Sequence, residues 1–177
     1  MKRVVFIVAP EMFRDEEYCK PKQILEDAGI NVITASVKTG ELIGRFGFKA
    51  ISSTLIGTIN PDNFNAIAYI GGSGCEIFFN NPYALKLANI FFEQRKPVAS
   101  ICIAGVILAN SGILKNKKAT VYIDGKDSLL KGGAIYMGNS LEVDGGIITA
   151  NGPQVAEEFG KAILKILESK FTRVFCN

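Results

Sequence analysis

Short, almost wholly apolar segments that alternate with helical segments constrain the fold of this chain more than any other feature. Residues 2–9 (KRVVFIVA), 30–36 (INVITAS) and 66–70 (AIAYI) have the length of strands and are rich in branched side chains. Helical spacing of apolar residues follows at 18–28 and 82–94. Strands that are apolar on both faces must be covered on both sides. The alternation therefore predicts an α/β fold with a parallel sheet and helices on both faces.

The rest of the chain continues this alternation. Residues 118–122 and 141–149 are predicted strands, residues 154–169 form an amphipathic helix, and the glycine-rich stretch 38–59 predicts a hairpin or meander. A chain of 177 residues with 48% hydrophobic residues is long enough for one domain with a substantial core. We expect a single domain over residues 1–170, followed by a C-terminal tail.

Charge and cysteine content exclude several classes of partner and site. The 20 basic and 17 acidic residues are spread along the chain, so no nucleic-acid patch is expected. The first apolar run is too short for a membrane span or an export signal, which favours a cytoplasmic protein. The chain has no histidine, and its four cysteines match no zinc or disulfide spacing. We therefore expect reduced thiols, no metal and no cofactor.

The segment KPVASICIAGVILAN places Cys102 where an apolar strand turns into a helix. A side chain at such an elbow is presented at the carboxyl end of the sheet, as in hydrolases with a serine nucleophile. The amides at the start of the helix can stabilise a thiolate and lower the pKa of the cysteine. The alternative is that Cys102 is only a small buried apolar residue. Cys19 and Cys75 lack an equally clear helix after them and rank lower.

Ligands of open parallel sheets bind at the carboxyl ends of the strands. This rule places two further turns beside Cys102. The first is the glycine turn YIGGSGC, where the amides of Gly72 and Ile103 could bind an oxyanion. The second is an acidic turn, in which one carboxyl group could serve as a general base or donate a hydrogen bond to the thiolate. The sequence pattern does not choose among its four carboxyl groups, Glu11, Asp15, Glu16 and Glu17.

The chain resembles the ThiJ/PfpI superfamily, whose members include protein deglycases and intracellular proteases. The resemblance extends in order over KRVVFIVAPEMFRDEEYCKP, AIAYIGGSG, ASICIAGVILANSGIL and VDGGIITANGPQVAEEFGKAILKIL. It implies a flavodoxin-like three-layer sandwich with Cys102 as the reactive thiol, Glu17 as its carboxyl partner, and Gly72 and Ile103 as oxyanion donors. It also implies a homodimer or a higher homo-oligomer.

The departures from the family pattern decide which activity to expect. Protease-like members place a histidine directly after the cysteine, where this chain has Ile103. Peptide hydrolysis needs a base that also protonates the leaving amine, so protease activity is not expected. The leading hypothesis is a cofactor-independent glyoxalase or deglycase, a hydro-lyase or hydrolase, acting on reactive aldehydes such as methylglyoxal or their adducts. One alternative is a non-enzymatic redox-sensing or stress-response protein with an oxidisable Cys102. Another is a protein that has lost the active site and whose fold serves only for binding or assembly.

Overall fold

The computed structural model describes residues 1–172, with side chains described through residue 169. Its helices are α1 (Asp15–Asp27), α2 (Pro82–Glu93), α3 (Gly105–Ser111), α4 (Lys126–Lys131) and α5 (Ala156–Thr172). Its strands are β1 (Arg3–Ile7), β2 (Glu11–Phe13), β3 (Asn31–Ser36), β4 (Gly40–Gly44), β5 (Lys49–Ser52), β6 (Thr54–Leu55), β7 (Ala66–Tyr69), β8 (Val98–Ile101), β9 (Lys118–Ala119), β10 (Ile135–Tyr136), β11 (Leu141–Asp144) and β12 (Ile147–Ala150). Among these residues no helix is long and apolar enough to cross a membrane.

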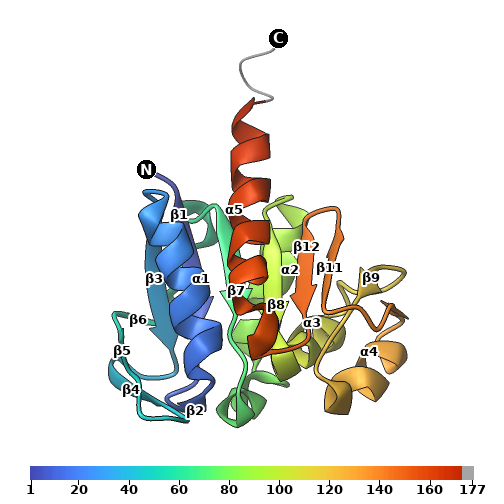
Figure 1. Ribbon diagram of the computed structural model, residues 1–177, viewed down its shortest axis with the longest axis horizontal. Helices are drawn as coiled ribbons and strands as arrows, with labels where there is room; N and C mark the ends of the chain where they lie inside the picture. Colours follow the sequence, from blue (N-terminus) through green and yellow to red (C-terminus); the bar gives the residue numbers. More distant parts are fainter. Residues whose placement is uncertain (173–177) are drawn as a thin grey trace.

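Seven strands form the central sheet in the order β11-β12-β8-β7-β1-β3-β6. Every neighbouring pair is parallel except β11 and β12. Helices α1 and α5 lie on one face of the sheet, and α2 and α3 lie behind it (Figure 1). The fold predicted from the apolar strands, a mostly parallel sheet covered on both faces, is confirmed.

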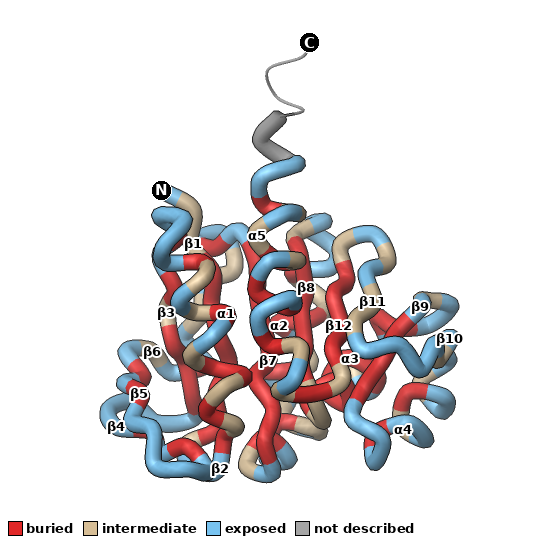
Figure 2. The backbone as a smooth tube through the Cα atoms, in the orientation of Figure 1, coloured by how far each residue is buried: buried red, intermediate tan, exposed pale blue. Residues whose placement is uncertain are grey.

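The core is divided by the sheet, because successive side chains of a strand point to opposite faces. In β1, Val5 and Ile7 belong to the cluster with α2 and α3, whereas Val4 and Phe6 belong to the cluster with α1 and α5. Figure 2 shows the central strands as buried over most of their length. This double burial explains why the strands are apolar at every position.

The two helices on the front face approach each other closely at Gly160. A Cβ atom at this position would lie 2.8 Å from the Cα atom of Pro21 in α1, which is too short for a normal contact. The missing side chain therefore lets α5 pack directly on α1. Pro21 lies one turn after the acidic residues at the start of α1.

The structure differs from the sequence prediction in several places. Residues 141–149 form a hairpin rather than one strand, because the chain reverses at Gly145 with a φ of 65°. The predicted strand 118–122 is reduced to β9, which pairs only with β10 in a separate sheet. Helix α1 begins three residues earlier than expected, at Asp15. Helix α5 (Ala156–Thr172) ends three residues later than the predicted helix over residues 154–169, and residues 173–177 of the predicted tail lie outside the described residues.

The stretch 38–59 contains the predicted hairpin. Its strands β4 and β5 are antiparallel and form a small sheet with β2. This small sheet lies at the carboxyl end of the central strands, at the lower left of Figure 1. It therefore borders the edge of the sheet where the sequence placed the candidate site.

Candidate active site

The elbow at Cys102 has the form predicted from the sequence. Strand β8 ends at Ile101, a 3-10 turn covers Cys102–Ala104, and α3 follows directly. Cys102 has a φ of 60°, in the left-handed region that residues other than glycine rarely occupy. The carbonyl oxygen of Cys102 accepts a hydrogen bond from the Tyr122 amide at 3.3 Å, which ties the elbow to the next loop. Backbone strain of this kind is typical of nucleophile elbows.

Glu17 lies in the first turn of α1 and is fully buried beside the elbow. The approach depends on Gly71, where a Cβ atom would contact the Glu17 carboxyl group and would lie 2.6 Å from Cys102 Cβ. Any larger residue at this position would separate the carboxyl group from the thiol. Gly71 is thus a structural requirement of the pair, and the sequence reasoning, which singled out Gly72, missed it.

Burial raises the pKa of Glu17 to about 8, because the charged carboxylate loses its hydration. The neighbouring Cys102, the Arg14 charge and the Gly71 amide oppose this rise in pKa only in part. Neither carboxyl oxygen makes a hydrogen bond of normal geometry to another described residue. Glu17 is therefore mostly protonated at neutral pH.

Burial, and after it the nearby Glu17 carboxylate, raises the pKa of Cys102 to about 12. The amides of Ile103 and Gly72 both face the thiol and lower its pKa, but they do not outweigh burial. The low thiol pKa expected from the helix terminus is therefore not found. The pair loses its first proton near pH 8, from the carboxyl group, and the carboxylate can then accept the thiol proton.

The structure distinguishes the four carboxyl groups of the acidic turn. Asp15 accepts hydrogen bonds from the amides of Phe46 and Phe48, at 3.0 and 2.8 Å, and so holds the β4–β5 turn. Glu16 pairs with Arg14 at 2.9 Å, and Glu11 is exposed on β2. Of the four, Glu17 is the one that lines the pocket with Cys102.

A pocket of about 640 Å³ opens over the elbow. The four residues singled out from the sequence, Glu17, Gly72, Cys102 and Ile103, all line it. Its wall also contains polar residues that the sequence reasoning did not single out: Arg14, Arg45, Glu76, Tyr122, Asp124 and Gln154. Most of them lie in connections between elements, where no hydrophobic periodicity marks their position.

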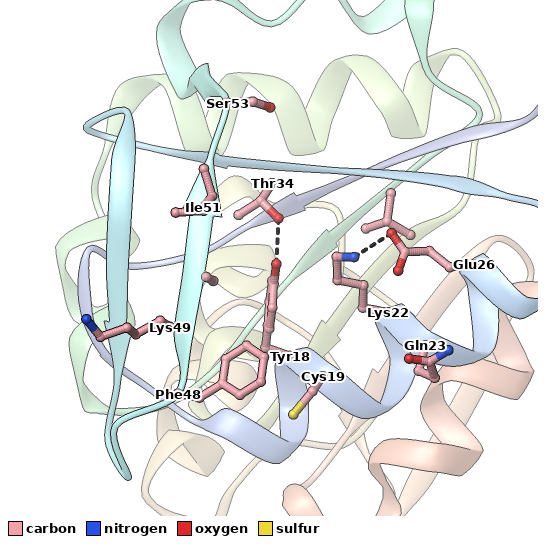
Figure 3. A pocket seen from close by; sticks show the side chains of 12 residues that line it. Tyr18, Cys19, Lys22, Gln23, Glu26, Thr34, Phe48, Lys49, Ile51 and Ser53 are labelled. Atoms are coloured by element: carbon pink, nitrogen blue, oxygen red, sulfur yellow. Dashed lines mark hydrogen bonds and ion pairs between the residues drawn. The ribbon is translucent and has the colours of Figure 1, made fainter.

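Neither of the other described cysteines lines this pocket. Cys75 is completely buried, and burial raises its pKa; the charges of the nearby Cys102 and Glu17 act in the same direction. Cys19 donates a hydrogen bond to the Asp15 carbonyl at 2.7 Å and lines a separate cavity of about 410 Å³. Figure 3 shows this cavity between α1 and the β5 strand, with Tyr18 hydrogen bonded to Thr34 at its centre. The described residues contain no cluster of potential metal ligands.

The sheet order, the elbow and the buried carboxyl–thiol pair define a flavodoxin-like α/β protein with a candidate cysteine site. Residues 2–166 match the model of the DJ-1/PfpI family. The chain belongs to this family.

Individual relatives agree with this assignment. The chain is similar to an uncharacterised protein of Methanocaldococcus jannaschii, with 40% identity over 94% of this chain and 82% of that protein. It is 30% identical to the deglycase PfpI of Pyrococcus furiosus, over 94% of this chain and 99% of the relative. The crystal structure of a ThiJ/PfpI domain protein from Brachyspira murdochii superposes with a TM-score of 0.92 at 30% identity, over 94% and 96% of the two chains.

Proposed function

We propose that this protein is a cysteine-dependent enzyme of the glyoxalase or deglycase type that acts on reactive aldehydes such as methylglyoxal or their adducts. The observation that carries the proposal is the buried Glu17 carboxyl group beside Cys102, at the bottom of an open pocket. Such a pair can add a thiol to a carbonyl group without a metal or an organic cofactor. The deglycase names of archaeal relatives at about 30% identity support the same class of chemistry.

The first step is addition of the thiol. The Glu17 carboxylate takes the proton of Cys102 while the sulfur attacks the aldehyde carbon, so that a C–S bond forms and the C=O π bond opens. The resulting oxyanion accepts hydrogen bonds from the amides of Gly72 and Ile103, the two amides that face the sulfur. Glu17 then returns the proton to this oxygen and produces a hemithioacetal.

The second step is isomerisation and release. With methylglyoxal, the hemithioacetal carbon and its hydroxyl group each lose a proton, while the neighbouring ketone carbon and its oxygen each gain one. The product is a thioester on Cys102, which water cleaves to lactate and the free thiol. The net reaction is addition of one water molecule to methylglyoxal, and it consumes no oxidant or reductant.

Proteolysis does not fit this site. The sequence contains no histidine, and the position after the cysteine is the apolar Ile103. Amide hydrolysis requires protonation of a strongly basic leaving amine, whereas addition to an aldehyde has no leaving group. The carboxyl–thiol pair is therefore better suited to carbonyl addition than to peptide hydrolysis.

Lactate formation from methylglyoxal tests the proposal. We expect activity in the wild-type protein, loss of it in Cys102→Ala and a strong decrease in Glu17→Gln. Cys19→Ala is the matched control, because Cys19 lines a different cavity, and it should retain full activity. The wild-type rate should increase with pH through a midpoint near 8, where Glu17 ionises. Absence of activity in the pure wild-type protein, or full activity in Cys102→Ala, would contradict the proposal.

A further inference from the structure

Two arginine side chains line the pocket that contains Cys102. Arg14 connects β2 to α1, and Arg45 follows β4. Both guanidinium groups lie against the ring of Phe46, with Cζ atoms 4.7 and 5.9 Å from its centroid. Two residues far apart in sequence thus place positive charge at the same side of the pocket.

The backbone positions of these arginines are fixed relative to the glycine turn. The Arg14 amide donates to the Gly71 carbonyl at 3.0 Å, and the Arg45 amide donates to the Phe13 carbonyl at 2.8 Å. Arg14 also acts electrostatically on Glu17, since its charge favours the carboxylate form and lowers the pKa of that residue. The basic side of the pocket therefore extends to the carboxyl–thiol pair.

The charges of the two arginines are not equally neutralised. Arg14 is paired with Glu16, through Nε–Oε2 at 2.9 Å. Arg45 has no ion pair with a carboxylate in the part of the chain that the structure describes, and its side chain is exposed at the pocket. A guanidinium group in this state is available to an anion, and its planar donors match a carboxylate or a phosphate.

The pocket also contains two acidic residues, and one of them shares a side with the arginines, because the turn that carries Glu76 packs against β2. Glu76 lies in the 3-10 turn Ser73–Phe78, and Asp124 lies in the turn Ile123–Gly125 just before α4. In Figure 1, α4 is at the lower right, whereas β2 and β4 are at the lower left. In this view the turn before α4, which carries Asp124, thus lies across the molecule from β2 and β4, the strands that the two arginines follow.

We propose that the substrate is a carbonyl compound that also carries an anionic group, a carboxylate or a phosphate, which Arg45 and Arg14 bind while Cys102 attacks the carbonyl carbon. This assignment rests on the proposed function, because it names the substrate class of the same thiol. It replaces a small neutral aldehyde by a charged one as the preferred substrate. Binding the anion holds the carbonyl carbon near the sulfur, and so favours addition through orientation.

Alkylation of Cys102 by iodoacetate and by iodoacetamide tests the charge preference directly. In both reactions the thiolate attacks the iodomethyl carbon and iodide leaves. The two reagents differ only by a carboxylate in place of an amide, so the ratio of their rates does not depend on the thiolate fraction or on the access to Cys102. Peptide mapping by mass spectrometry separates Cys102 from Cys19. We expect the iodoacetate to iodoacetamide ratio of the wild-type protein to exceed that of 2-mercaptoethanol by about fivefold, the upper range for partly exposed charge pairs.

Variants assign the preference to the arginines. Arg45→Gln should lower the ratio by about threefold, and Arg45→Lys should keep most of it because the charge remains. Lys49→Gln is the matched control, because it removes a cation from the same hairpin. The Lys49 side chain pairs with Glu41 and does not line this pocket. A wild-type ratio equal to that of 2-mercaptoethanol, or equal ratios in Arg45→Gln and Lys49→Gln, would overturn the proposal.

Protection experiments identify the anion. Glyoxylate and inorganic phosphate are tested separately for protection of Cys102 against iodoacetamide. Protection by glyoxylate supports a carboxylate substrate, protection by phosphate supports a phosphorylated one, and protection by neither overturns the proposal. These experiments also separate a failure of this proposal from a failure of the proposed function. If the protein forms no lactate but has a high ratio of iodoacetate to iodoacetamide alkylation, the methylglyoxal chemistry is wrong and the preference for an anion remains.

Discussion

Glu17→Gln should make the protein more stable at neutral and mildly alkaline pH. In the unfolded chain the carboxyl group has an ordinary pKa of 4.5, whereas burial raises it to about 8 in the folded protein. Between these values the unfolded state releases a proton that the folded state keeps, so the stability contributed by this group is complete below pH 4.5 and is lost as the pH increases towards 8. A glutamine has a similar shape and does not ionise in either state.

The magnitude follows from the two pKa values. At pH 7.5 the pKa shift lowers the free energy of unfolding of the wild-type protein by about 4 kcal/mol relative to a side chain that stays neutral in both states. At pH 5 the same shift lowers it by about 1 kcal/mol. The advantage of Glu17→Gln over wild type should therefore grow by about 3 kcal/mol from pH 5 to pH 7.5. The same variant should lose methylglyoxal activity, because the amide cannot accept the thiol proton.

Urea unfolding at a series of pH values measures this effect. Glu158→Gln serves as the control, because Glu158 is an exposed carboxylate of α5 and its removal should leave the pH dependence of the wild type intact. The reasoning is refuted if the free-energy difference between Glu17→Gln and wild type is the same at pH 5 and pH 7.5. That result would mean that the folded protein does not hold this carboxyl group in its neutral form.

Three further predictions follow from close contacts and from the buried thiol. Gly71→Ala should lower methylglyoxal activity at least about tenfold, because the added Cβ would lie 2.6 Å from Cys102 Cβ and 2.7 Å from the Ile101 carbonyl oxygen. Lactate formation by this variant at the wild-type rate would disprove that the site requires glycine at this position. Gly160→Val should destabilise the protein by about 1–3 kcal/mol in urea unfolding, because the side chain would meet Pro21, and an unchanged midpoint would contradict the α1–α5 contact. Burial raises the pKa of Cys102 to about 12. Peroxide at pH 7 should therefore oxidise Cys102, followed by mass spectrometry, at least about tenfold more slowly than it oxidises the thiol of 2-mercaptoethanol. Faster oxidation of Cys102 would instead favour the redox-sensing hypothesis.

Several local features of the site could be predicted from the sequence because they depend on neighbouring residues. The apolar strand that ends at Ile101 and the small residues after Cys102 indicate a strand–turn–helix elbow without any knowledge of the rest of the fold. The glycine turn after β7 is recognisable for the same reason. The rule for open parallel sheets then places both turns at one edge.

Other features could not be read from local pattern. Asp15, Glu16 and Glu17 are consecutive carboxyl groups in one helical turn, and helical spacing alone does not indicate which of them faces the thiol. The answer depends on Gly71, which lies in the turn after β7, far away in sequence, and leaves room for Glu17. The positive side of the pocket likewise depends on the β4–β5 hairpin, which brings Arg45 beside Arg14.

The sequence by itself determined the alternation of the central strands and the main helices, the elbow and the absence of an imidazole base, because these depend on residue type and short-range periodicity. The tertiary structure alone decided the protonation of the site. Helix α1 packs beside α5 on one face of the sheet and buries Glu17 beside Cys102, and the lost hydration raises the pKa of both groups. Desolvation is a property of everything that surrounds a group in space, and no short stretch of the sequence contains it.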